Sequence, residues 1–180
     1  MTHPIGDGAA RRRFIRGSIW WTVPGTCLAV VAGYGLSPLL REVGDPGARL
    51  AMAARWLVVA LVPYVAVCAH IAIARYLEGS HDPLAGAESE RLRIHCRVMQ
   101  NTLEHLLWFA ICVLALAPLL APAQARIVPV LCVAFAAARF VYWRGYLRDG
   151  TLGRAPGVQM TFTLNIASLA AVLVLFARSL

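Results

Sequence analysis

Three polar residues recur at helical spacing in the segment RVMQNTLEH, residues 97–105. Arg97, Asn101 and Glu104 stand at positions i, i+4 and i+7, so a helix places them on one face. A guanidinium, an amide and a carboxylate gathered on one face can bind a zwitterionic ligand. A second interpretation is an Arg–Glu pair that only joins two helices.

A second group of basic and aromatic residues occurs in ARFVYWRGYLRDG, residues 138–150. Arg139, Tyr142 and Tyr146 again share a helical spacing, and Arg148 follows them. These residue types can hold anionic groups, because arginine binds carboxylates and tyrosine donates hydrogen bonds. The alternative is an interfacial aromatic belt with arginines that extend to the head groups.

The composition indicates the solvent in which these groups lie. The chain has 180 residues, of which 59% are hydrophobic and 14% charged, and its mean hydropathy is +0.66. A soluble domain has about 25% charged residues, so this chain has too few polar residues to cover a surface facing water. We therefore expect an integral membrane protein, which excludes a Rossmann or P-loop enzyme.

Five apolar segments are long enough to cross a bilayer, which takes about 20 helical residues. No segment alternates like a strand, so we expect an all-α bundle. The five expected spans are Ser18 to Leu40, Trp56 to Ala74, His95 to Leu120, Ile127 to Tyr146 and Val158 to Ala177.

The basic residues predict the orientation. All 17 are arginines, and an N-terminus in the cytoplasm places 12 of them inside and 5 outside. The positive-inside rule then favours a cytoplasmic N-terminus and an external C-terminus. Membrane lipid explains this basic excess, so we do not expect a nucleic-acid partner.

The cysteines and histidines do not predict a metal site. Five cysteines are scattered without a CxxC motif, which argues against disulfides and zinc. His95 and His105 lie too far apart for a helical i, i+4 ligand pair. We expect no metal.

Taken together, the two polar groups resemble the family of membrane-associated proteins in eicosanoid and glutathione metabolism, the MAPEG family. The resemblance rests on Arg97, Asn101 and Glu104 at the start of one helix and on Arg139, Tyr142 and Gly145-Tyr146 at the end of the next. It implies a MAPEG-like four-helix transmembrane bundle that forms a homotrimer, with glutathione bound between neighbouring subunits near the cytoplasmic face. The expected division is residues 1–50, a basic flank with an extra N-terminal transmembrane helix, and residues 51–180, the four-helix domain.

The resemblance also implies roles for individual residues. Arg75, in AIARYLEG, matches the arginine that stabilises the glutathione thiolate and is the expected catalytic residue. His105 stands where some relatives have tyrosine or asparagine, and Arg154 is a basic residue one place later than the family pattern. The residues expected to bind glutathione are Arg97, Asn101, Glu104, His105, Arg139, Tyr142, Tyr146 and Arg148.

The sequence thus predicts a membrane glutathione transferase or peroxidase, in a bacterial inner membrane, that uses glutathione as cosubstrate. It would conjugate a hydrophobic electrophile or reduce a lipid hydroperoxide. The alternative is a non-enzymatic protein of the same fold that binds lipid or a partner protein. A small transporter is disfavoured, because the five spans show no internal repeat.

Overall fold

The structure, a computed structural model, describes residues 8–37, 43–80 and 88–180, and these residues are helical almost throughout. The long helices, in chain order, are α1 (Gly8–Gly35), α2 (Pro46–Glu78), α3 (Glu90–Leu119), α4 (Ile127–Gly153) and α5 (Ala155–Arg178). A short 3-10 turn, Pro122–Gln124, precedes α4. All five long helices are apolar enough to span a membrane, so the protein is an all-α integral membrane protein.

The helix boundaries extend beyond the apolar segments. The first helix extends further toward the N-terminus than the expected span, Ser18 to Leu40, because α1 begins at Gly8 and includes the arginine run. Arginine is a good helix former, so a helix continues past the last apolar residue. The described helix ends at Gly35, and the expected end at Leu40 lies outside the described residues.

Local signals fix the ends of α2 and α3. Asp45 caps α2 by accepting a hydrogen bond from the amide of Ala48 at 2.7 Å, and Gly79 ends that helix with φ of 68°. Ser89 caps α3 by accepting from the amide of Leu92 at 3.1 Å. Side-chain oxygens at these positions satisfy amides that have no partner within the helix.

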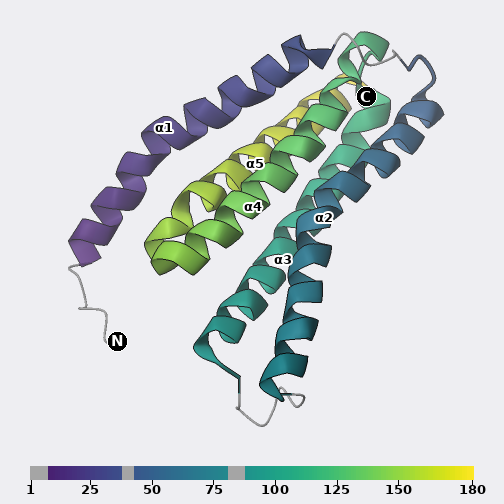
Figure 1. Cartoon of the computed structure of the whole chain (residues 1–180). Helices are drawn as coiled ribbons and strands as arrows, with labels where there is room; N and C mark the ends of the chain where they lie inside the picture. The colour runs from purple at the N-terminus through teal and green to yellow at the C-terminus, as the bar shows by residue number, and fades with distance from the viewer. Residues whose placement is uncertain (1–7, 38–42, 81–87) are drawn as a thin grey trace.

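The helices pack as two antiparallel pairs with one further helix outside them (Figure 1). α2 lies against α3 and α4 against α5, while α1 contacts α5 and α4. The core between α3 and α4 includes Phe109 stacked on Phe135, with ring centroids 4.4 Å apart. Many large apolar side chains, such as Trp20, Leu107 and Ile111, are exposed on the outer surface, as expected where lipid is the solvent.

Two glycines shape the corner between α4 and α5. Gly150 has φ of 61° and ψ of −136°, a conformation that only glycine adopts readily, and the helical chain bends there. Gly157 lies so close to the backbone of Tyr142 that a β-carbon would overlap it. This corner brings the end of α4 and the start of α5 together beside α3.

Candidate ligand-binding site

Arg139, on α4, is the largest fully buried side chain in the described protein, with 1% of its surface exposed. Its Nη2 donates to the Oδ1 of Asn101 at 3.0 Å and to the Oγ1 of Thr102 at 2.9 Å, both on α3. Its Nη1 donates to Thr161 on α5 at 3.5 Å. All these acceptors are neutral, so the described chain holds this charge without a carboxylate in ion-pair contact.

Two tyrosines continue the cluster along α4. The guanidinium of Arg139 lies 4.1 Å from the ring centre of Tyr142, and the rings of Tyr142 and Tyr146 are 5.9 Å apart. Arg154, at the junction of α4 and α5, stacks over Tyr146 at 4.9 Å. The electron-rich ring faces thus stabilise both cations without neutralising them.

A cavity of about 240 Å³ opens beside this cluster. Its polar wall contains Asn101, Tyr142 and Arg154. The start of α5 also borders it, and the N-terminal end of a helix carries a partial positive charge. The remaining lining residues are Ile15, Thr151, Ala155, Val158 and Gln159. The cavity therefore combines a cation, an amide and a phenol, a set that suits a carboxylate-bearing ligand.

The rest of the expected stripe on α3 lies on the surface of the chain. Arg97 and Glu104 are exposed, whereas Asn101 between them is half-buried. Glu104 accepts a hydrogen bond from Gln100 at 3.3 Å, and Arg97 and Glu104 form no salt bridge with each other. Both charges thus face the surroundings of this chain, where a bilayer makes an unpaired charge costly.

His105 has an interior environment apart from the cavity. It is buried, and the amide of Asn165 lies 3.3 Å from its Nδ1 and donates to its backbone carbonyl at 3.2 Å. Its ring also stacks with Trp108 and meets the edge of Phe162. These contacts are those of a packing residue between α3 and α5.

Arg75 lies in a separate cluster between α2 and α3. Its Nη2 donates to the Oε1 of Glu88 at 2.6 Å and approaches the sulfur of Cys96 at 3.8 Å. Arg75 does not line the cavity that contains Asn101 and Tyr142. Within one chain, its charge is therefore paired with a carboxylate rather than directed at that cavity.

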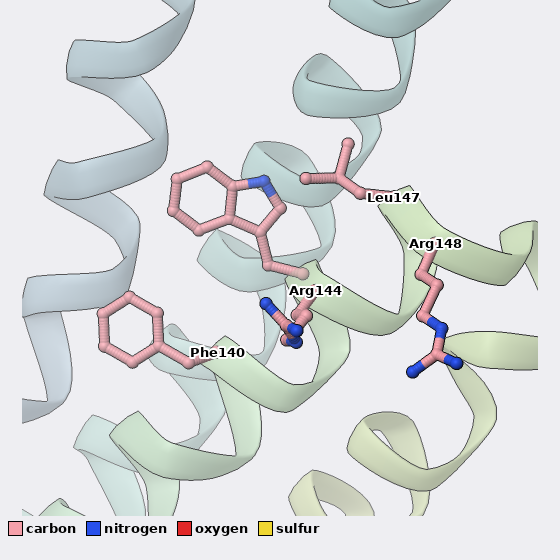
Figure 2. A pocket seen from close by; sticks show the side chains of 5 residues that line it. Phe140, Arg144, Leu147 and Arg148 are labelled. Carbon is pink, nitrogen blue, oxygen red and sulfur yellow. The ribbon is translucent and has the colours of Figure 1, made fainter.

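Arg148 lines a different, larger hollow of about 470 Å³. Figure 2 shows it with Phe140, Arg144 and Leu147, all on α4. Arg148 also forms an ion pair with Asp149 at 3.6 Å, and both side chains are exposed. The structure thus separates Arg148 from the tyrosines near it in sequence.

Aromatic contacts between α2, α3 and α4 form a third group. Trp143 donates to the Nδ1 of His95 at 3.0 Å, and the rings of His70 and His95 lie 4.1 Å apart. Within residues 8–37, 43–80 and 88–180, the buried Nε2 of His95 has no hydrogen-bond partner. This group joins α2, α3 and α4 at the same end of the bundle as the cavity.

Several residues of the site were not found from the sequence. Thr102 and Thr161 bind Arg139, but lone threonines in apolar helices are ordinary and give no signal. Gln159 did give a signal in the sequence, because this polar residue interrupts an apolar span. Arg154 was noticed as a basic residue but was not assigned to the site.

Comparison with known proteins gives one match. The model of the MAPEG family matches residues 53–177, which include α3 and α4, most of α2 and nearly all of α5. Searches of curated proteins and of solved structures found no match.

Proposed function

We propose that this protein is a membrane-bound glutathione transferase or peroxidase. The chain belongs to the MAPEG family, as the match over residues 53–177 shows. The observation that carries the proposal is the cavity beside Arg139. There, Asn101, Tyr142 and Arg154 converge, and no carboxylate in the described residues pairs with either arginine. Many members of the family use glutathione, which carries two carboxylates, one ammonium and a thiol.

We assign the binding roles by charge. Arg154 takes one glutathione carboxylate, while Asn101, Tyr142 and Tyr146 supply neutral hydrogen bonds. Arg139 lies behind Asn101 and Tyr142, so it orients them and adds positive potential. His105 keeps its expected place among the binding residues, although its contacts within the chain are those of packing.

The exposed charges on α3 support a homotrimer. Arg97 and Glu104 have no ion-pair partner within the described chain, and a neighbouring subunit would remove them from lipid. In such an assembly they bind the glutamyl end of glutathione between subunits. Arg75 then acts on the thiol bound by the adjacent chain, and Arg148 is a flanking cation.

The chemistry follows from the thiol. A free thiol has a pKa near 8.5, and a nearby cation such as Arg75 raises the thiolate fraction at neutral pH. The thiolate sulfur attacks an electrophilic carbon, a carbon–sulfur bond forms, and the leaving group departs with its electron pair. With a lipid hydroperoxide, two thiols are oxidised to a disulfide while the hydroperoxide is reduced to an alcohol and water.

The placement in the membrane is also a proposal. The arginine count favours a cytoplasmic N-terminus, which puts the cavity near the cytoplasmic face of a bacterial inner membrane. We propose that residues 51–180 form the catalytic domain. Residues 1–50 would then be the basic flank and the extra helix.

The experiment is a paired measurement on the purified protein in mild detergent. Native mass spectrometry is expected to show a trimer, and added glutathione to produce thiolate absorbance near neutral pH together with conjugation of an apolar aryl halide. A protein that is only monomeric, or a bound thiol that never ionises, contradicts the proposal. The second outcome would favour a non-enzymatic protein that binds lipid or a partner.

A further inference from the structure

Helix α1 lies before the residues that match the family, yet it packs as a part of the bundle. Its buried side chains are Ser18, Thr22 and Thr26, spaced four residues apart on one face. Large apolar residues such as Trp20 and Leu28 point outward. Small residues toward protein and large apolar residues toward lipid are typical of packed transmembrane helices.

Side-chain contacts hold α1 near both of its ends. At one end, Tyr34 donates to the carbonyl of Ala123 at 3.3 Å, and Arg126 lies over its ring at 4.6 Å. At the other end, the Nε2 of Gln159 on α5 donates to the carbonyl of Ile15 at 3.0 Å and to the Oγ of Ser18 at 2.8 Å. The second contact lies at the cavity.

The hydrogen bonds of Gln159 to Ile15 and Ser18 hold α1 against the cavity, so that α1 forms one of its walls. Ile15 and Gln159 both line it, and Ile15 faces the same space as the polar wall of Asn101, Tyr142 and Arg154. Val158 and Ala155 add further apolar surface. The Oε1 of Gln159 is buried without a hydrogen-bond partner among the described residues, so there the Gln159 side chain binds α1 through its Nε2 alone. The cavity therefore has a polar wall from α3, α4 and Arg154 and an apolar wall from α1 and α5.

We propose that α1 sets the size of the group attached to the thiol, with Ile15 as a specificity-determining residue and Gln159 as the positioning residue that holds it. This inference rests on the proposed function, because it takes the ligand to be glutathione or its conjugate. The polar wall binds the peptide, and the apolar wall limits the sulfur substituent. A helix outside the family domain thereby becomes part of the binding site.

The test compares two ligands that share the peptide and differ in the sulfur substituent. S-methylglutathione and S-hexylglutathione are titrated by calorimetry into the wild-type protein and its variants. Ile15→Trp fills the space and is expected to lower affinity for the hexyl conjugate about tenfold, with affinity for the methyl conjugate little changed. Ile15→Ala enlarges the space and shifts the ratio of the two affinities toward the hexyl conjugate.

Two controls distinguish an effect of the cavity wall from a general effect of a larger side chain on α1. Ile19→Trp changes an exposed residue one turn further along α1, outside the cavity lining, and leaves the ratio unchanged. Gln159→Leu removes both hydrogen bonds to α1 and is expected to weaken the size discrimination, while Gln159→Glu, which keeps an acceptor but lacks the donor, does not restore it.

The outcomes distinguish the inference from the proposed function. If wild type binds neither conjugate, the proposed function fails and this inference fails with it. If the conjugates bind but both Ile15 variants keep the wild-type ratio, only the inference is overturned. Should Ile15→Trp fail to fold, the ratio measured for Ile15→Ala decides the question alone.

Discussion

Two buried arginines bind different parts of α3 and differ in the groups that hold them. Among the described residues, Arg49, 5% exposed, donates only to main-chain carbonyls, those of Ala117 and Pro118 at the end of α3 and of Val43 and Gly44 before α2. Arg139, 1% exposed, donates only to side chains in the part of the chain that the structure describes, and it stacks on the ring of Tyr142.

The two sets of partners indicate what each charge does. The last carbonyls of a helix have no partner in the helix and carry partial negative charge, so Arg49 completes the end of α3. The partners of Arg139 are side chains, and two of them, Asn101 and Tyr142, also line the cavity. Arg49 thus stabilises the end of α3, whereas we propose that Arg139 arranges the side chains of a binding site.

The largest expected effect is on the fold. Replacing Arg49 by Met leaves several carbonyls without their donor, and a hydrogen bond to a charged group contributes about 1.5–3 kcal/mol. We expect Arg49→Met to lower the free energy of unfolding by about 3 kcal/mol, allowing for the relieved desolvation of the charge. Thermal unfolding in detergent measures this, with exposed Arg55→Met as the control. Equal stability of the two variants would refute the role of Arg49.

The next effect is on ligand affinity. Arg154 lines the cavity and its guanidinium lies over the ring of Tyr146, so in the proposed site its loss removes a direct contact to a glutathione carboxylate. We expect Arg154→Ala to weaken glutathione binding by about 10- to 100-fold, the loss of one charge-assisted hydrogen bond. Arg178→Ala, at the other end of α5, should bind like wild type. Equal loss in both variants would indicate only a general charge effect.

We expect the loss of Arg139 to affect ligand affinity more than stability, whereas the loss of Arg49 affects stability. Its removal relieves a buried cation held by neutral groups, which offsets the hydrogen bonds lost, so stability changes less than in Arg49→Met. Affinity for glutathione should fall about tenfold, because Asn101 and Tyr142 lose their support. Arg139→Lys, which keeps the charge but not the planar fork, should recover part of it. A large loss of stability with unchanged affinity would place Arg139 beside Arg49 as a structural residue.

The smallest expected effect concerns the thiol. If Arg75 stabilises the thiolate, its pair with Glu88 competes for the same charge. Arg75→Ala should raise the pKa of bound glutathione toward 8.5, and Glu88→Gln should lower it, each by about one unit. Titration of the thiolate absorbance measures both. Glu78→Gln, which removes a carboxylate that accepts from Ser89 instead of Arg75, serves as the control. A pKa that neither Arg75→Ala nor Glu88→Gln changes would exclude Arg75 from the chemistry.

The sequence predicted the fold well, because hydropathy alone identifies membrane helices. Five apolar segments corresponded to five helices, and the errors lay at ends such as Gly8, where arginines continue the helix beyond the apolar residues. The family was also predicted from two polar groups, and the match over residues 53–177 confirms it.

The site was harder to predict. Helical spacing shows which residues share one face of a helix, but it does not show which other helix or cavity that face contacts. Arg97, Asn101 and Glu104 share a helical face, yet only Asn101 lines the cavity within one chain. Arg148 lies close to Tyr146 in sequence, but it borders another hollow. The contributions of Gln159 and Ile15 depend on how α1 packs on α5, and no local pattern in either segment contains that information.

We propose above all that the cavity between α1, α3, α4 and α5 binds glutathione through Arg154. The most direct test is a calorimetric titration of glutathione into purified wild type and Arg154→Ala under identical conditions. We predict saturable binding to wild type and a dissociation constant about 10- to 100-fold larger for the variant. The absence of saturable binding to wild type, or equal dissociation constants for the two proteins, would contradict the claim.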